Sequence, residues 1–370
     1  MATARNRSSR PDVAAHALRR ALGALCALAI GTVLVACSTP SGANLVSATN
    51  GAAAAPVTLR LGYFPNITHA TAIVGVEAGI FARDLGPSVS LQTSQFNAGP
   101  AAVEALFADA LDASYVGPNP AINAFIQSHG EAVRVLAGAT SGGSSLVVQP
   151  DVNSAADLVG KGVASPQLGN TQDVALRHWL STQGLKTTPT GGGDVFVVPQ
   201  DNSQTLQTFR SGQIAGAWVP EPWATRLVQE GGGKVLVDER DLWPNGQFPT
   251  TLLIVRAAFM QQHPDVVDGL VRAHTDATDY VNSQPAQAQR QVNEALRRLT
   301  GSSLSDEAMA GAWKNMSFTV DPLAAALRQS AANATDLGFL QLGGQNIDQI
   351  YNLDALNRVL RASGKPEVSS

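Results

Sequence analysis

Cysteine is nearly absent from this chain, and its two copies, Cys26 and Cys37, both lie near the N-terminus. The region after Cys37 therefore has no disulfide, no thiolate metal site and no cysteine nucleophile. Its histidines stand singly, without the spacing of metal ligands. No phosphate-binding loop, G-x-S-x-G or H-E-x-x-H motif occurs. We therefore predict no metal and no cofactor, and the sequence argues against an enzyme.

Basic residues are also scarce after Cys37. Five of the 25 basic residues and one of the 29 acidic residues precede it, so 20 basic and 28 acidic residues follow, a net charge of −8. This excess of negative charge argues against binding to nucleic acid and against a basic patch that holds a membrane. The roughly 330 residues that follow the N-terminal region are enough for two domains.

An apolar run is present only at the N-terminus. Arg5 and Arg7 open a basic start, and residues 21–36 carry no charge, as in an export signal. The end of this run, Leu34-Val35-Ala36-Cys37, resembles a bacterial lipobox, in which the cysteine is cut free and acylated. We predict a signal peptide at 1–36 and lipidation of Cys37, which would anchor the protein on the extracytoplasmic side of the cell membrane. The alternative is an uncleaved anchor, but the run is shorter than the ~20 apolar residues of a membrane-spanning helix. Whether export is Sec-dependent or twin-arginine-dependent stays open.

The rest of the chain alternates strands and helices. Residues 37–56 are rich in Ser, Ala, Asn and Gly and are expected to form a flexible tether. Up to residue 255, short apolar segments alternate with segments of helical spacing, which is typical of an α/β fold with parallel sheets. The remainder is expected to be mostly helical. The predicted strands are 57–63, 89–93, 113–116, 133–137, 146–148, 163–165, 195–198, 215–219, 235–237 and 251–255, and the predicted helices include 66–84, 264–282, 285–299, 305–313 and 323–337.

Two similar segments point to two lobes. Residues 103–116 read as a helix that leads into a short strand, and Gly117-Pro118-Asn119-Pro120 follows. Residues 206–219 repeat this pattern and run into Pro220-Glu221-Pro222. Chance resemblance between two βα units is the alternative. We favour two lobes of similar plan that share a cleft, because ligands of open α/β sheets bind at the carboxyl ends of the strands.

Four polar segments follow predicted strands or open predicted helices. Helix starts offer unpaired N–H groups and the positive end of the helix dipole, so several of them together can hold an anion. Each segment alone is more simply an N-cap or a turn, but the four together favour a binding cleft. They are residues 66–69 with Asn66, 97–100 with Gly99, 141–145 with Ser141 and Ser144, and 167–172 with Asn170 and Thr171.

Aromatic and acidic residues near the predicted cleft have two interpretations each. Trp218 fits a strand core, whereas Trp223 fits a cleft wall. Glu221 either complements a helix dipole or meets an ammonium group of the ligand. Tyr63 ends the first strand and fits either a cleft wall or plain packing. His69 is interpreted as a polar helix-start residue rather than a catalyst.

These features resemble the substrate-binding lipoproteins of ABC importers for aliphatic sulfonates, taurine and nitrate. The resemblance covers residues 59–264 and more loosely the helical tail. Its most specific segments are Phe96-Asn97-Ala98-Gly99-Pro100, Ala156-Asp157-Leu158-Val159-Gly160-Lys161 and Pro220-Glu221-Pro222-Trp223. It implies a two-lobed periplasmic-binding-protein fold of type II, with parallel-rich sheets flanked by helices and a helical C-terminal tail. Residues 57–150 and 246–370 would form one lobe and 151–245 the other, with a hinge near 147–150 and 246–250.

The resemblance also implies a function. The protein would capture a small organic anion, most simply an aliphatic sulfonate, and deliver it to an ABC permease and its ATPase subunits. Gly99, Asn119, Ser144, Asn170, Thr171 and Glu221 would line the cleft, and we expect a monomer. Related binders often carry an aspartate where Glu221 stands, which leaves the far end of the ligand open. Nitrate, bicarbonate or a pyrimidine precursor is the alternative ligand, and an enzyme or a signalling receptor on the same fold is the alternative class.

Overall fold

Two mixed sheets organise the part of the chain that the structure, a computed structural model, describes, residues 56–370. The first sheet has the strand order β11-β4-β10-β3-β1-β2. In it, β1 runs parallel to β2 and β3, whereas β10 is antiparallel to β3 and β4, and β11 is antiparallel to β4. Its strands are β1 (Val57–Tyr63), β2 (Val89–Gln95), β3 (Ala113–Val116), β4 (Val133–Gly142), β10 (Pro249–Arg256) and β11 (Met316–Phe318).

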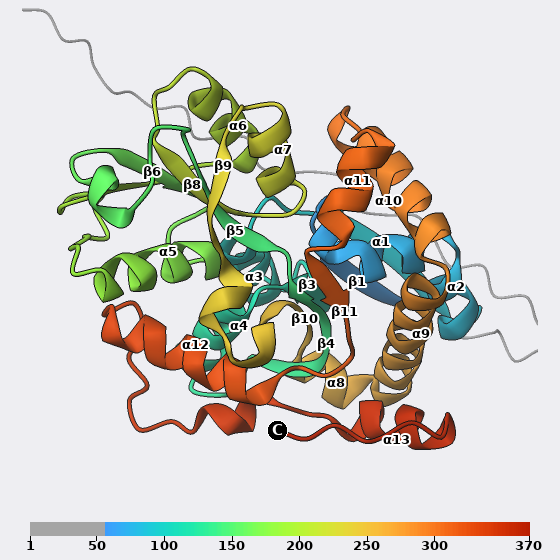
Figure 1. Cartoon of the computed structure of the whole chain (residues 1–370). Coiled ribbons are helices and arrows are strands. Elements are labelled where there is room, and N and C mark those ends of the chain that lie inside the picture. Colours follow the sequence, from blue (N-terminus) through green and yellow to red (C-terminus); the bar gives the residue numbers. More distant parts are fainter. Residues whose placement is uncertain (1–55) are drawn as a thin grey trace, which may run out of the picture. The chain divides into compact units, whose positions relative to one another are not determined.

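The second sheet has the order β7-β6-β8-β5-β9. Here β6 is parallel to β7 and β8, whereas β5 is antiparallel to β8 and β9. We refer to the first sheet with its helices as the first lobe and to the second sheet with its helices as the second lobe (Figure 1). The strands of the second sheet are β5 (Ser144–Val148), β6 (Gly162–Ser165), β7 (Phe196–Pro199), β8 (Gly216–Pro220) and β9 (Lys234–Asp238).

The chain crosses between the sheets at Gly142 and Gly143, and not at 147–150 as predicted. Both glycines have positive φ, +78° and +77°, which only glycine adopts without strain. β4 ends at Gly142 in the first sheet, and β5 begins at Ser144 in the second. The segment 144–150 therefore belongs to the second lobe. The second crossing runs between β9, which ends at Asp238, and β10, which begins at Pro249, so it includes Gly246.

The architecture is the predicted α/β fold with two sheets flanked by helices and a helical C-terminal region. The sheets are mixed because the crossing strands β4, β5 and β10 pair antiparallel with neighbours in their own sheets. Parallel pairs such as β1 with β2 need a helix between them, and this requirement explains the βα alternation in the sequence.

Helices cover both faces of the first sheet. One buried core includes Leu61, Tyr115 and Leu270, and another, on the opposite face, includes Leu252, Ile122 and Leu327. The predicted helix at 66–84 is divided at Gly79, whose φ of +68° ends one helix and starts the next. The N-terminal elements are the short 3₁₀ helix η1 (Ile67–His69) and the helices α1 (Ala70–Glu77), α2 (Ile80–Leu85), α3 (Gly99–Phe107) and α4 (Pro118–Gln127).

The second sheet also has a core on each face. Trp218 and Trp179 pack in one core, and Phe209 and Val219 pack in the other. The helices of this lobe are α5 (Thr171–Thr182), α6 (Asn202–Arg210) and α7 (Trp223–Gln229). Three 3₁₀ helices complete the lobe and the second crossing: η2 (Ala155–Leu158), η3 (Glu239–Leu242) and η4 (Pro244–Gly246).

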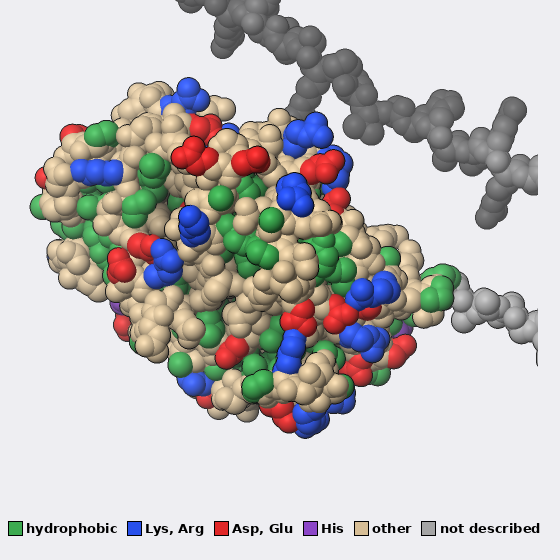
Figure 2. Space-filling model, turned by 45° about the vertical axis from the view of Figure 1, so that its right-hand side comes forward, with side chains coloured by type: hydrophobic (Ala, Val, Ile, Leu, Met, Phe, Trp, Pro, Cys, Tyr) green, Lys and Arg blue, Asp and Glu red, His purple; other side chains and the backbone are tan. Residues whose placement is uncertain are grey.

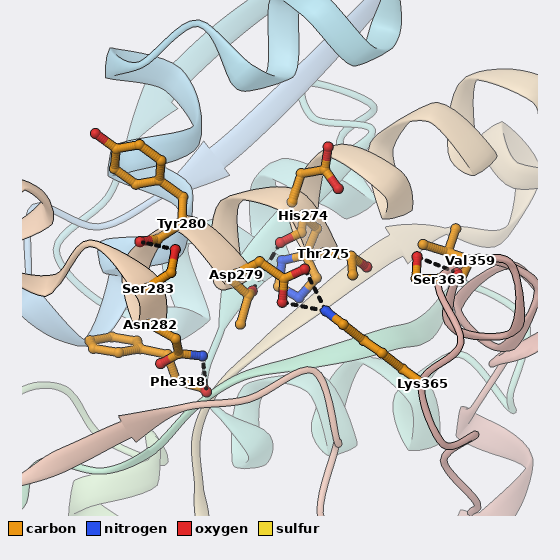
Figure 3. A network of polar contacts seen from close by, with 12 residues as sticks. His274, Thr275, Asp279, Tyr280, Asn282, Ser283, Phe318, Val359, Ser363 and Lys365 are labelled. Atoms are coloured by element: carbon orange, nitrogen blue, oxygen red, sulfur yellow. Dashed lines mark hydrogen bonds and ion pairs between the residues drawn. The ribbon is translucent and has the colours of Figure 1, made fainter.

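The C-terminal region packs mainly on the first lobe, and its helices α11 and α12 also contact α7 and α5 of the second lobe. His274 of α9 is fully buried, with Nε2 2.7 Å from the carbonyl of Gly138 and Nδ1 2.8 Å from the hydroxyl of Tyr115. Figure 3 shows this region, in which Lys365 of the chain end pairs with Asp279. The prediction missed β11 and α13. The elements are α8 (Ala257–Gln262), α9 (Pro264–Ser283), α10 (Pro285–Thr300), α11 (Asp306–Trp313), α12 (Ala324–Asp336), η5 (Ile347–Ile350) and α13 (Asp354–Ala362).

Among the described residues, no helix is both long enough and apolar enough to span a bilayer. Figure 2 shows one face of the molecule, on which Lys and Arg side chains are interspersed with Asp and Glu rather than gathered in one patch. The predicted signal peptide, Cys37 and all of the predicted tether except Pro56 lie outside the described residues.

Candidate ligand-binding cleft

A small cavity lies between the two lobes and receives residues from both. Its volume is about 30 Å³, which is room for a group of a few atoms. The first lobe contributes the strand ends of β1 and β10 and the starts of its helices, and the second lobe contributes the ends of β6 and β8 and the starts of α5 and α6. The lining residues are Phe64, Asn66, Thr68, His69, Asn97, Ala98, Gly99, Gly117, Pro120, Pro166, Asn170, Thr171, Gln172, Asn202, Pro220 and Thr250.

Four α-helices begin at this cavity. Gly99 is the first residue of α3, Gly117 is the N-cap of α4, Thr171 opens α5 and Asn202 opens α6. The first turn of a helix has N–H groups without intrahelical partners and carries the positive end of the dipole. The N-cap side chain of Asn170 accepts one of these N–H groups, from Asp173 at 2.9 Å. The remaining helix starts form a positive environment without a cationic side chain.

No Lys, Arg, Asp or Glu side chain is among the described residues that line the cavity. Asp173 follows the lining residue Thr171 by two positions in the sequence and is fully buried. Its carboxylate pairs with Arg177 at 3.0 Å and accepts from the hydroxyl of Ser165 at 2.6 Å. The negative charge of Asp173 is therefore compensated by Arg177 within the second lobe. The helix starts then determine which sign of ligand charge the cavity favours. They favour an anion.

His69 lines the cavity as a neutral ring. Its side chain is buried, and burial lowers its pKa to about 3. The backbone N–H of Phe64 donates to Nδ1 at 3.3 Å, and the Phe64 ring lies 4.3 Å away between centroids. The imidazole therefore adds a packing surface and a neutral polar atom to the site, but no positive charge.

Four of the predicted site residues line this cavity: Asn66, Gly99, Asn170 and Thr171. Thr171 is the most informative, because its buried hydroxyl has no hydrogen-bond partner within the described chain. A buried polar group without a partner costs free energy, and a ligand oxygen would remove that cost. Asn66 is 6% exposed and uses its Oδ1 to accept from the indole N–H of Trp223 at 3.1 Å.

Four other predicted residues lie beside the cavity without lining it. Tyr63 points into the core of the first lobe, and Gln95 donates to its hydroxyl at 3.2 Å. Successive residues of a strand face opposite sides, so the next residue, Phe64, meets the cavity instead. Asn119 donates to the carbonyl of Ser330, and Ser141 accepts from the N–H of Phe248. Ser144 is buried at the start of β5.

Glu221 and Trp223, in the second lobe, contact residues of the first lobe and do not line the cavity. The carboxylate of Glu221 is 1% exposed and accepts from the N–H and the hydroxyl of Thr225, both at 3.0 Å. It also accepts from the amide of Asn315, in the first lobe, at 2.7 Å. Burial raises the pKa of Glu221, and these hydrogen bonds oppose that effect. Its carboxylate is thus occupied by protein donors.

A larger pocket, which we call the outer pocket, adjoins the cavity. It shares Asn66, Asn97 and Asn202 with the cavity and has a volume of about 560 Å³. Its walls include Phe96, Trp223, Leu206 and Leu299, together with Arg210, Arg226, Asp201 and Glu230. Arg226 lies over the Trp223 ring, 5.0 Å from its centroid, and pairs with Glu230 at 2.7 Å.

Sequence reasoning missed Gly117, Asn202 and Thr250 as lining residues. Asn202 had a signal, because it opens a helix just after a predicted strand, the same pattern that singled out Asn170. The signal for Gly117 was weaker. Gly117 directly precedes Pro118-Asn119-Pro120, and Asn119 of this segment was selected from the sequence instead. Thr250 had none, because it reaches the cavity only through the pairing of β10 beside β3 and β4.

The fold and the cleft define a two-lobed α/β protein with a candidate binding site between its lobes. A model described as the NMT1-like family matches residues 52–296, so the chain belongs to this family. The chain is 27% identical over 280 residues to a binding protein of Brucella abortus, covering 75% of this chain and 82% of that one. It is 28% identical over 226 residues to the taurine-binding periplasmic protein of Escherichia coli, covering 60% and 67%.

Solved structures share the fold. The alkanesulfonate-binding protein SsuA of Xanthomonas axonopodis, bound to MOPS, matches with a TM-score of 0.65 and 18% identity over 78% of this chain and 96% of that one. The nitrate-binding protein NrtA of Synechocystis PCC 6803 matches with a TM-score of 0.68 and 15% identity over 83% and 89%. These similarities confirm the predicted family and fold, and the matched relatives are binding proteins, which supports the prediction that the chain is not an enzyme.

Proposed function

We propose that the protein captures an organic sulfonate in this cleft and delivers it to an ABC permease and its ATPase subunits. The observation that carries the proposal is the two-part site. An uncharged cavity at the starts of four helices suits a compact anionic head group, and it adjoins a pocket with aromatic and aliphatic walls. Such walls contribute through apolar contact with an organic body.

The proposed organic sulfonate is larger than a bare inorganic anion. The cavity of about 30 Å³ has room only for the head group, whereas the outer pocket of about 560 Å³ has room for a substituent. The relatives named as taurine-binding and alkanesulfonate-binding support the same head group. The small cavity and the similarity to the nitrate-binding NrtA support a second candidate, nitrate or bicarbonate held in the cavity alone.

We further propose that Cys37, after signal-peptide removal, carries the lipid that holds the protein on the extracytoplasmic side of the membrane. The lipobox-like segment Leu34-Val35-Ala36-Cys37 supports this. An acyl anchor keeps the binding protein near its permease, and two or more chains together give stable attachment.

A calorimetric titration tests the proposed ligand. We expect ethanesulfonate and a larger aromatic sulfonate to bind, and the matched neutral ethanesulfonamide not to bind, because it keeps the shape but loses the charge. Nitrate, bicarbonate and a pyrimidine precursor complete the panel. Binding of nitrate or bicarbonate without any sulfonate would replace the proposed ligand by the second candidate.

A matched pair of variants on α5 assigns the binding to the cavity. Thr171→Val keeps the shape but removes a hydroxyl without a protein partner, so we expect about a 10-fold loss of sulfonate affinity, worth about 1.4 kcal/mol, without loss of stability. Thr182→Val, at the exposed end of the same helix, is the control. Equal affinities of the two variants would argue against the cavity as the binding site.

A further inference from the structure

A second pocket shares no lining residue with the cleft, although α5 contributes residues to both. It has a volume of about 270 Å³ and lies between α5, the second crossing and α12, which are neighbours in Figure 1. We call it the crossing pocket. Its lining residues are Ala175, His178, Trp179, Thr182, Glu239, Leu242, Trp243, Pro244, Gln329 and Asn333.

Two tryptophans give this pocket aromatic walls, one from each side. Trp179 of α5 is 8% exposed and packs against Trp218, with ring centroids 6.1 Å apart. Trp243 of the crossing is stacked on Phe248 at 5.6 Å with an interplanar angle of 16°. Both rings are thus held by a second aromatic residue behind them. Tryptophan faces attract cations more strongly than any other side-chain face.

One carboxyl group lies at the inner end of the crossing pocket. Glu239 is 1% exposed, and its Oε2 accepts from the indole N–H of Trp218 at 2.7 Å. No Lys or Arg is among the described residues that line this pocket. Gln329 and Asn333, which α12 contributes, are neutral and bond to each other at 2.8 Å. The carboxyl group is therefore buried without a cationic partner in the pocket.

The other charged groups near Glu239 do not supply the cationic partner that its carboxyl group lacks. Asp238, its chain neighbour, raises the pKa of Glu239 further, while Arg240 is engaged with Asp238 at 2.5 Å. His178 of α5 has a pKa lowered by burial, so its ring adds no charge at neutral pH. Burial raises the pKa of Glu239 to about 7, and hydrogen bonds from Trp218, Ser144 and Trp243 have smaller opposing effects.

We propose that the crossing pocket binds a small organic cation, an ammonium group joined to an apolar or aromatic body. The ammonium group would pair with the carboxylate of Glu239, and the body would lie between Trp179 and Trp243. A buried carboxyl that lacks a cationic partner gains the most from such a ligand, because the pair removes the cost of an isolated buried charge. This site is separate from the cleft, which favours an anion.

Proton release is the signature that separates this proposal from plain apolar binding. Glu239 is about half protonated near neutral pH, and the cation binds its ionised form, so binding releases part of a proton to the solvent. We expect titration calorimetry of the purified protein with benzylamine at pH 7 to give an apparent heat that depends on the ionisation enthalpy of the buffer. At pH 8.5, where the carboxyl is already ionised, this dependence should fade.

Matched ligands and variants make the test decisive. Benzyl alcohol, which lacks the charge, and benzoate, which reverses it, should bind at least about 10-fold more weakly than benzylamine. Glu239→Gln should lower the benzylamine affinity at least about 10-fold and abolish proton release. Ala175→Phe should block the pocket, whereas Ala325→Phe, at an exposed position of α12 outside the lining, should not.

Thermal unfolding of each variant confirms that it is folded, and sulfonate titration of the Ala175→Phe protein reports the cleft independently. Absence of benzylamine binding to the native protein would overturn the proposal. Equal affinity for benzyl alcohol, or unchanged benzylamine affinity in Glu239→Gln or Ala175→Phe, would overturn it as well. None of these outcomes bears on the proposed sulfonate ligand, because the two sites share no residue.

Discussion

The indole N–H of Trp223, in the second lobe, donates to Oδ1 of Asn66, in the first lobe, at 3.1 Å. This hydrogen bond joins the two lobes at the place where the cavity meets the outer pocket. Opening of the cleft would break it and return both groups to water. It therefore adds to the stability of the closed form, and the apparent ligand affinity depends on how far that form is populated.

We predict that Trp223→Phe weakens ligand binding by about 10-fold, equivalent to about 1.4 kcal/mol. Phenylalanine keeps an aromatic side chain but lacks the indole N–H, so Asn66, which is 6% exposed, loses its donor. An unsatisfied buried acceptor costs about 1–3 kcal/mol. Calorimetry with the bound ligand measures the loss. Trp313→Phe, which changes a tryptophan that packs on Phe318 within the first lobe, is the control.

Gly117→Ala should prevent full closure of the cleft without unfolding either lobe. A Cβ atom at Gly117 would lie 2.2 Å from Oγ1 of Thr171, which belongs to the opposite lobe. The φ of Gly117 is −73°, so alanine suits the backbone there. We expect at least a 10-fold loss of ligand affinity and a larger radius of gyration with ligand, measured by small-angle scattering.

A second substitution should restore what Gly117→Ala loses. Thr171→Gly removes the side chain that meets the new methyl group, so the double variant should close again, although it lacks the Thr171 hydroxyl. Gly311→Ala, where no atom lies within 4 Å of the added Cβ, serves as the control. If the Gly117→Ala protein bound ligand as tightly as the native protein, the close approach of α4 and α5 would not be needed for binding.

Glu221 is predicted to act on stability rather than on ligand choice. Its carboxylate accepts three hydrogen bonds, two from Thr225 and one from Asn315. Glu221→Ala leaves these donors unpaired in a buried place, so we expect a loss of about 2–4 kcal/mol of unfolding free energy. Affinities for taurine and for ethanesulfonate, which differ by an amino group, should change by the same factor. A selective loss for taurine would instead show that Glu221 meets the ligand's ammonium group.

The order of strands and helices could be predicted because periodicity and helix starts are local. The βα alternation up to β10 and the helical tail after it follow from the spacing of apolar residues, and most of the predicted strands lie within one or two residues of the observed ones. The crossing at Gly142 and Gly143 could not be located in this way. The apolar segments on its two sides look alike, and only their pairing partners assign them to different sheets.

The candidate site was predictable where backbone position decides it. Asn66, Gly99, Asn170 and Thr171 line the cavity because helix starts gather at the carboxyl ends of the strands. Side-chain partners are not local, and they decide the rest. Glu221 lies at a helix start, as the sequence indicates, yet Asn315, from a distant segment, occupies its carboxylate. No pattern near Glu221 reveals that contact.

Stability should depend on pH through Glu239. Its pKa is about 7 in the folded protein because of burial, against 4.5 as the ordinary value. Between these values the folded state binds more protons than the unfolded state, so the unfolding free energy falls as pH rises from about 4.5 to about 7. Above about pH 7 the Glu239 carboxylate is ionised in the folded protein, and its burial then lowers the unfolding free energy by on the order of a few kcal/mol.

Glu239→Gln isolates this effect, because glutamine keeps the size and an acceptor for Trp218 but does not ionise. His69 and His274, whose pKa values burial lowers to about 3 and about 4, work in the opposite direction, since their contribution to stability is lost as pH falls below about 6.5. They are present in both proteins and cancel in the comparison. Urea unfolding at pH 5 and at pH 8 measures the difference between variant and native protein. We expect the unfolding free energy of Glu239→Gln, minus that of the native protein, to be larger at pH 8 than at pH 5. A margin that does not change with pH would mean that Glu239 has the same pKa in the folded and unfolded states.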